Sequence, residues 1–413
     1  MSTSSSSSYS SSDESDDSKF ISAGDWDEHS SWVEHFEQFC ASDELSLKRM
    51  KRMTSEIFVH HVMSDFEFSP FFFLVCMNKN VTVKIIRHLL NKFRYIDGGI
   101  GLVNVCMDME MIDERLEMDS AYPIHLACLN EDCPGDVIIL LMEKGDAYSL
   151  THLCFKGEES FKYFNDVGGT PLHFYLGRKT NVEVDVVKKF LSLDPNALSM
   201  ADDETRCTPM HTLMGNENLG TMRDVLQYLV ETNPTSCRLT DTYNQLPLHV
   251  ACGSKTVTSE IVSLLLNVWP ESIRVTDEME NLALHHFCRR TTPTELDDEE
   301  SLKILKQLIN AYPNSVYQKE DGEDALPIHI AAGAKRGAEF CKTLITAYPE
   351  SVQVASLPLH HACGGGLPET VEYLLSIYPE SINMRDEQGF LPIHSATCCA
   401  SECAHFVFGP LLV

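Results

Sequence analysis

The stretch Leu246-Pro247-Leu248-His249-Val250-Ala251-Cys252 recurs along the chain with small changes. Eight copies end their Pro-Leu-His core in a histidine: His125, His173, His211, His249, His285, His329, His360 and His394. Seven of them carry proline two residues before the histidine. Because proline has no backbone N–H, it suits the first turn of a helix, where that N–H would lack an intrahelical partner. Each copy therefore predicts the start of a helix.

The copies recur at a loose period. Successive motif histidines are 48, 38, 38, 36, 44, 31 and 34 residues apart. A second apolar stretch follows each copy by about ten to fifteen residues, as at 261–266 or 304–309, and is typical of another helix. In most units that stretch ends just before a proline, which disfavours the helical conformation of the preceding residue. A unit of two helices that recurs at such a period predicts a stacked repeat protein.

This order of residues resembles the ankyrin repeat family over roughly residues 69–413. The family pattern is Asp-x-x-Gly-x-Thr-Pro-Leu-His-x-Ala followed by a second helix with a Leu-Leu core. The resemblance implies an all-α solenoid of helix-turn-helix units joined by short β-turn fingers. It also implies that the repeat histidines hydrogen-bond near their own helix start and to the next unit. The Asp and Gly positions of the fingers correspond to Asp203 and Arg206, Asp241 and Asn244, Asp277 and Glu280, Asp321 and Asp324, and Asp386 and Gly389.

The chain divides by composition and pattern. Residues 1–19 are mostly Ser with four acids and predict a disordered tail. Residues 20–68 predict an N-terminal helical segment. Residues 69–96 predict a degenerate first repeat, in which Phe72 takes the histidine position after Pro70. An insertion at 97–120 then precedes the regular repeats at 121–413.

The step of 31 residues after His329 is the shortest of the series. Pro349 and His360 are 11 residues apart, whereas Pro270 and His285 are 15 apart. We therefore expect no room for a normal finger at 352–356.

Composition limits the functional classes. Lys and Arg number 32 against 61 Asp and Glu, a formal charge of −29, which disfavours nucleic-acid binding because phosphate backbones are repelled. The chain opens with a Ser run rather than an apolar signal segment, and no apolar run reaches the roughly 18–20 residues of a membrane span. Fifteen cysteines in such a chain are interpreted as reduced thiols. We expect a cytoplasmic or nuclear protein.

No catalytic or cofactor-binding motif is found, so we expect neither catalysis nor a cofactor. The eight histidines are interpreted as structural, because metal ligands must converge on one point. His394, Cys398, Cys399, Cys403 and His405 form a denser group whose spacing matches no standard zinc pattern.

Acidic residues gather in the predicted fingers, which in this architecture line a concave face with the first helices. Two interpretations stay open: a surface for partners with basic segments, or turn-forming residues that also keep the chain soluble. The candidate partner-binding residues are Asp202, Asp203, Glu204, Asp241, Asp277, Glu278, Glu280, Glu320, Asp321, Glu323, Asp324, Asp386 and Glu387.

The sequence thus predicts a non-catalytic scaffold or adaptor that binds partner proteins, with an undetermined oligomeric state. One alternative is a metal- or redox-responsive sensor that uses the C-terminal Cys/His group. Another is an adaptor that recruits substrates to a larger enzyme complex.

Overall fold

The computed structural model of the protein describes residues 36–60, 65–93, 102–106, 120–154, 169–178, 182–290, 299–321, 324–354, 358–365 and 367–398. Most helices alternate along the chain between an inner and an outer row. The inner row is α3 (Asp65–Met77), α5 (Pro123–Leu129), α8 (Pro171–Arg178), α10 (Pro209–Gly215), α12 (Pro247–Gly253), α14 (Ala283–Arg289), α16 (Pro327–Gly333), α18 (Pro358–Gly365) and α20 (Pro392–Cys398). The outer row is α2 (Leu47–His60), α4 (Val83–Lys92), α6 (Gly135–Lys144), α9 (Val184–Leu193), α11 (Arg223–Thr232), α13 (Ser259–Val268), α15 (Glu299–Ala311), α17 (Ala338–Ala347) and α19 (Pro368–Ile377). The predicted all-α repeat solenoid is confirmed.

The helix boundaries follow from proline chemistry, as the sequence predicts. The motif proline is the first residue of α12 and of six other inner helices. Outer helix α13 ends at Val268, and Pro270 then opens a 3₁₀-helix, η10 (Pro270–Arg274). The same arrangement recurs in η9 (Pro234–Arg238), η11 (Pro313–Tyr317), η12 (Pro349–Gln353) and η13 (Pro379–Asn383).

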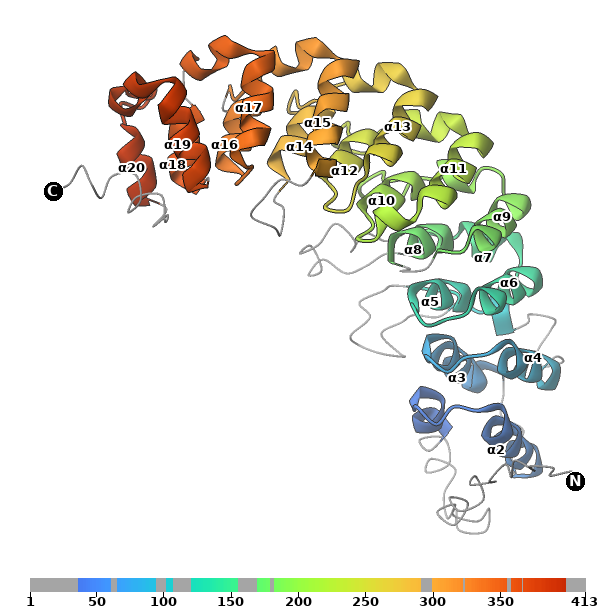
Figure 1. Ribbon diagram of the computed structural model, residues 1–413. Helices are drawn as coiled ribbons and strands as arrows, with labels where there is room; N and C mark the ends of the chain where they lie inside the picture. The colour runs from blue at the N-terminus through green and yellow to red at the C-terminus, as the bar shows by residue number, and fades with distance from the viewer. Residues whose placement is uncertain are drawn as a thin grey trace, which may run out of the picture.

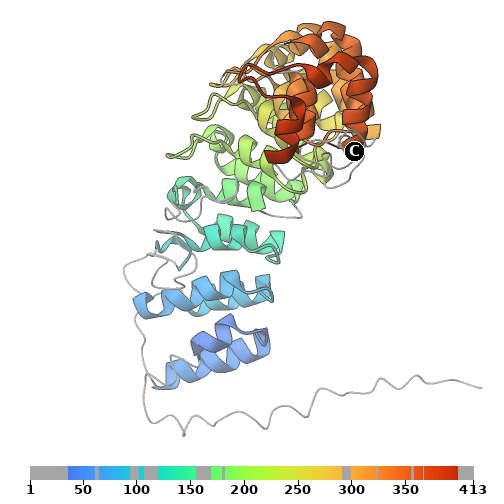
Figure 2. The same ribbon diagram turned by 90° about the vertical axis from the view of Figure 1, so that its left-hand side faces the viewer.

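The helix pairs stack into an arc. Each inner helix from α3 to α20 contacts the next inner helix, and each outer helix from α2 to α19 contacts the next outer helix. The inner row lies on the inside of the arc in Figure 1. Figure 2 shows the turns between units projecting together from one side of the stack.

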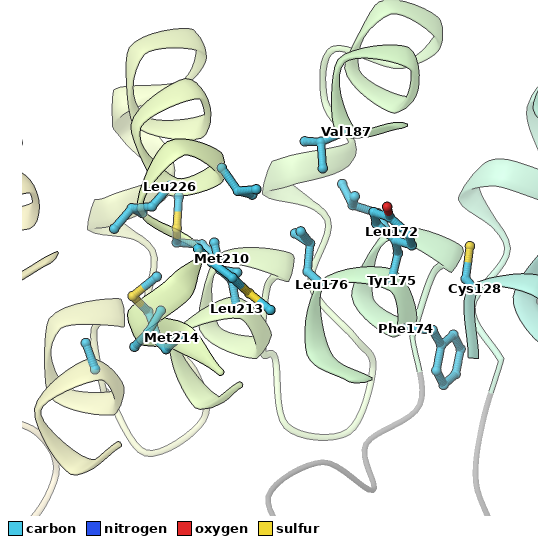
Figure 3. Packing of buried hydrophobic residues seen from close by; sticks show 14 of the residues in the cluster. Cys128, Leu172, Phe174, Tyr175, Leu176, Val187, Met210, Leu213, Met214 and Leu226 are labelled. Atoms are coloured by element: carbon cyan, nitrogen blue, oxygen red, sulfur yellow. The ribbon is translucent and has the colours of Figure 1, made fainter. Parts of the chain in front are cut away.

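The core is continuous along the described part of the stack. Buried side chains from consecutive inner helices interdigitate, as Leu176, Met210 and Leu213 do between α8 and α10 (Figure 3). Outer-helix residues such as Val187 and Leu226 close the core from the other row. Because each unit packs only on its neighbours, stability is close to a sum of nearest-neighbour interfaces.

The N-terminal segment extends this stack. Residues 36–41 are helical, and α2 contacts α4 of the next unit. The ring of Phe36 packs edge-on against Phe71, with centroids 5.0 Å apart. This part of residues 20–68 therefore continues the packing of the array.

The first repeat differs from its expected register. Helix α3 begins at Asp65, so Pro70 lies inside it rather than opening it. Counting back from the end of the helix, Phe73 corresponds to His125 of α5, whereas the sequence comparison had placed Phe72 there. The tail at 1–19 lies outside the described residues, and of the insertion at 97–120 only 102–106 and 120 are described.

Two sets of polar contacts link successive units. Asn78, Asn130 and Asn216 directly follow inner helices, and each donates through Nδ2 to carbonyl oxygens at or just past the end of the helix one unit earlier. On the outer side, the Arg238 and Arg274 guanidinium groups lie over the rings of Trp269 and Tyr312 of the next unit. The rings of Tyr317 and Tyr348 also meet between units, tilted by 51° with centroids 4.4 Å apart.

We expect Asn216→Ala to lower the free energy of unfolding by about 2 kcal/mol, because it removes donors to the carbonyl oxygens of Leu176 and Gly177 at a site 2% exposed. Urea unfolding followed by circular dichroism measures the loss. The exposed neighbour Glu217→Ala serves as control and should change it by less than about 0.5 kcal/mol. Equal stability of the two variants would contradict this role for Asn216.

Candidate functional site: the fingers and the inner helices

Each motif histidine lies at the base of a finger. In α12 the backbone N–H of Leu246 donates to Nδ1 of His249 at 2.9 Å, so the ring proton is on Nε2. Nε2 donates to the carbonyl oxygen of Val275 in the next unit at 3.0 Å. The same two bonds are made by His125, His173, His211 and His285. The imidazole thus joins its own helix start to the next finger.

The last three histidines depart from this pattern. His329 accepts from the N–H of Leu326 at 2.9 Å, but no described group accepts from its Nε2. His360 donates through Nε2 to the carbonyl oxygen of Phe390 at 3.0 Å. His394 accepts from the N–H of Leu391, but its side chain is exposed. The threonine of the family pattern is kept in only two of the eight units, where the hydroxyls of Thr170 and Thr208 lie within 2.9 Å of Nδ1.

Burial keeps these rings neutral. It lowers the pKa to about 4 in each of His125, His173, His211, His249 and His285. Burial, with a smaller effect of His361, lowers the pKa of His329 to about 3. A neutral imidazole with one N–H and one free lone pair is the form that both bonds of the link require.

The fingers are tight turns closed by a carboxylate. In the finger that begins at Asp241, Oδ1 accepts from the N–H groups of Tyr243 and Gln245. Asn244 then takes a positive φ of 57°, and the corresponding residues of four other fingers do the same: Arg206 (55°), Glu280 (59°), Asp324 (54°) and Gly389 (86°). The left-handed positions therefore fall where the sequence placed them, although most are not glycine.

The carboxylate position is shifted in two fingers. Asp202 rather than Asp203 closes the first finger, and the N–H of Glu320 rather than that of Asp321 pairs with the end of the fourth. Their closing bonds, from Asp202 N to Cys207 O and from Glu320 N to Ala325 O, span one residue more than the bond from Asp241 N to Gln245 O. The alignment of the repeats in the sequence assumed that all fingers have the same length. The extra residue in these two fingers explains why the closing residue lies one position earlier than expected.

The candidate acids separate into two groups. Asp202, Asp241, Asp277 and Glu320 are buried, and Asp386 is half-buried; the four aspartates accept finger N–H bonds. The side chains exposed to solvent are Asp203, Glu204, Glu278, Glu280, Asp321, Asp324 and Glu387. Glu323 lies outside the described residues. Only the second group is placed to meet a partner.

Asp277 carries one more contact. His286 Nε2 lies 2.9 Å from its Oδ2. Burial alone would raise the pKa of Asp277, but the bonds from His286 and the backbone outweigh it and lower the pKa to about 2. This carboxylate therefore stays charged while it closes the finger.

Backbone bonds join the fingers into a row. The N–H of Thr242 donates to Thr205 O, that of Glu278 to Tyr243 O, and that of Asp321 to Met279 O. The row carries exposed apolar side chains that the sequence reasoning did not single out: Tyr243 is 51% exposed and Met279 55%. Phe390, at the end of the last finger, is 49% exposed. In the sequence, the position of these residues within the predicted fingers is the feature that could have indicated their exposure.

A groove of about 670 Å³ opens beside this row, between the fingers and helices α16 and α18. We call it the finger-gap groove; it is lined by Met279, Glu320, His329, Ile330, Ala334 and His361, among others. An ion pair between Arg289 and Glu320 lies in its wall.

A histidine, a serine and a cysteine, residue types that can act in catalysis, lie close together away from the fingers. His152 Nε2 lies 3.2 Å from the Ser120 hydroxyl and 4.0 Å from the Cys106 thiol, beside the first regular repeat. Burial raises the pKa of Cys106, which opposes formation of the thiolate nucleophile. Burial therefore disfavours Cys106 as a nucleophile.

In the described part of the chain, no group of three or more His, Cys, Asp or Glu residues could hold a metal ion. Cys399, Cys403 and His405 lie outside that part, so the alternative of a C-terminal metal site stays a prediction. Among the described helices, none combines the length and the apolar character needed to cross a membrane.

Paired helices, positive-φ fingers and histidines that link each unit to the next define the repeat. The fold resembles that of an ankyrin-repeat solenoid. No family model and no curated protein matches the sequence. Among solved structures, the human ASB11 ankyrin repeat domain is similar with a TM-score of 0.43 and 17% identity, covering 57% of this chain and 96% of that one. The Bd0816 predatory endopeptidase from Bdellovibrio bacteriovorus in complex with immunity protein Bd3460 is similar with a TM-score of 0.36 and 14% identity, covering 48% and 95%.

We expect the ankyrin array to lose stability as the pH falls from about 6.5 towards 4. An unfolded histidine with a pKa near 6.5 takes up a proton in this range, whereas buried His249 stays neutral down to about 4. At pH 5.5 each such histidine therefore destabilises the fold by about 1.4 kcal/mol relative to pH 7.5.

The variant His249→Gln removes one of these titrating groups. Its free energy of unfolding, measured with urea at both pH values, should fall by about 1.4 kcal/mol less than that of the wild type on acidification. An identical loss in both proteins would contradict the assignment of a buried neutral imidazole to this position.

Proposed function

We propose that the protein is a non-catalytic scaffold or adaptor that binds partner proteins with basic segments through the finger row and the inner helices. A curved repeat array offers an extended concave surface of this kind. The observation that carries the proposal is the composition of the finger row. Exposed Glu204, Glu278, Glu280 and Asp321 alternate there with exposed Tyr243 and Met279.

The two residue classes have different physical effects. Exposed carboxylates around an apolar side chain attract a basic partner at long range and raise its association rate. Tyr and Met are enriched at the centres of protein interfaces, because they bury a large area. The backbone bonds between fingers hold both classes in fixed positions, so little ordering cost arises on binding.

The test uses a fluorescein-labelled peptide of alternating Val and Lys, acetyl-Val-Lys-Val-Lys-Val-Lys-amide, and measures its affinity by anisotropy at several salt concentrations. In the finger variant, Glu204, Glu278, Glu280 and Asp321 are all changed to Lys. We expect an affinity loss of about tenfold or more and a weaker salt dependence, because the attractive charges have been reversed.

The control variant changes four exposed acids on the outer side to Lys: Glu231, Glu350, Glu372 and Glu380. It alters the net charge by the same amount, and we expect it to keep the affinity within about twofold. Equal losses in both variants would favour the other interpretation, in which the acids act only through net charge and solubility.

A further inference from the structure

The row of fingers has a gap. Residues between a 3₁₀-helix and the next inner helix number eight after η9, η10 and η13 and nine after η11. Between η12 and α18 only residues 354–357 remain, which is four. The chain therefore lacks the length to place a finger between those of 320–325 and 386–390.

The gap leaves one hydrogen-bond donor unused. The N–H of Leu326 donates to Nδ1 of His329 at 2.9 Å, so the remaining ring proton is on Nε2, as in the other units. Nε2 of His329 is buried and none of the described groups accepts from it, Val354 included. The equivalent atoms of His249 and His285 reach carbonyl oxygens of the following finger segment, Val275 and Gln318, at 3.0 Å. An unsatisfied buried donor is unfavourable by about 1–3 kcal/mol.

The same place is hollow. His329 is one of the residues beside the finger-gap groove, which has a volume of about 670 Å³. Its other walls include Met279 and Asp321 from the neighbouring fingers and Ile330 and Ala334 from the end of α16. Arg289 also lines the groove, where it is paired with Glu320. His361 of α18 lies opposite, with its ring centroid 5.4 Å from that of His329. A buried, unsatisfied donor thus belongs to a residue beside a groove with the size of a short peptide segment.

We propose that an extended segment of a partner protein fills the finger-gap groove and that one of its main-chain carbonyl oxygens accepts the Nε2–H of His329. This inference rests on the proposed function and specifies where on the finger row a partner is held. The group that satisfies this histidine nitrogen in the other units is an extended backbone carbonyl, so the same group fits here. Main-chain hydrogen bonds of this kind are the usual source of affinity when a peptide adds beside an existing row of strands or turns.

Charge selects the occupant. Exposed Asp321, Glu278 and Glu280 lie on the two fingers beside the groove, so a segment with Lys or Arg side chains is favoured. The chain's own residues 399–413 contain no Lys or Arg and one Glu, so they lack this complementarity.

Three variants of the full chain test the groove with the same Val-Lys peptide. Ala334→Phe fills the groove from its wall, and Ala334→Ser is the control that leaves it open. A third variant carries four residues copied from 241–244 between residues 354 and 355, which supplies the length of a finger. We expect Ala334→Phe and the insertion each to weaken binding by about tenfold, and Ala334→Ser to leave it within about twofold.

The carbonyl is tested from the side of the peptide. Replacing each amide in turn by an alkene keeps the shape but removes both the carbonyl acceptor and the N–H, whereas an ester keeps a carbonyl and removes only the N–H. At one position the alkene should weaken binding by about tenfold and the ester should weaken it less. In protein labelled with ¹⁵N-histidine, the Nε2–H signal of His329 should shift on saturation with the peptide and stay unshifted with the corresponding Val-Glu peptide.

Several results would overturn the inference. Absence of binding at about 1 mM peptide would do so, as would full affinity in Ala334→Phe. If the acid-to-Lys finger variant loses affinity while Ala334→Phe and the insertion do not, the proposed function stands and the groove assignment is wrong. If Ala334→Phe loses affinity while the finger variant does not, the groove stands and the charge-based part of the proposed function fails. If deletion of residues 399–413 raises the affinity for the Val-Lys peptide by about tenfold, this segment is the occupant of the groove and the inference is wrong.

Discussion

A neutral imidazole that holds two backbone groups at once is the interaction on which the stack depends. In His249, one ring nitrogen satisfies the first N–H of its own helix, and the other satisfies a carbonyl of the next unit. The N–H has no acceptor within its own helix, because the first N–H groups of a helix lack intrahelical partners. The bond therefore fixes the helix start and the position of the next finger together. Stability that depends on neighbours in this way is the reason that the repeats form a continuous array rather than separate domains.

Local chemistry made much of the fold predictable. The start of α12 at Pro247 and the end of α13 before Pro270 depend on backbone geometry within a few residues, and both were read from the sequence. The left-handed residue Asn244 was placed by its distance from the motif. Features that depend on neighbouring units were not predictable in this way. The stacking of Arg274 on Tyr312 joins two units, and the sequence showed only that Tyr312 precedes a helix-ending proline.

The acidic residues show the same limit at the candidate site. Asp277 and Glu278 are adjacent and chemically alike, yet Asp277 is buried and accepts backbone bonds while Glu278 is exposed. From composition alone, both residues would be counted as acidic surface residues. Which of them is available to a partner depends on the path of the turn, and one additional residue in a finger moves the buried role from Asp203 to Asp202. The charge that a partner meets is therefore smaller than the sequence suggests, and it is concentrated at the finger tips.

The irregular unit after His329 shows how a solenoid accommodates a site. In a globular core, an unsatisfied buried donor weakens a single cooperative unit, whereas in an array its effect falls mainly on one interface. Helix α16 still packs on α14 and α18, and buried Arg336 lies over the rings of Phe287 and Phe340, with its guanidinium carbon 3.9 Å from the centroid of the latter. These contacts stabilise the interface where the finger is short. The short finger thus leaves a groove beside His329 and an unsatisfied ring N–H, without removing the packing that positions this histidine. In a regular repeat, the hydrogen-bond donors at the finger base are already satisfied within the array and cannot bind a partner. Irregular units are therefore the places where such an array can bind a partner specifically.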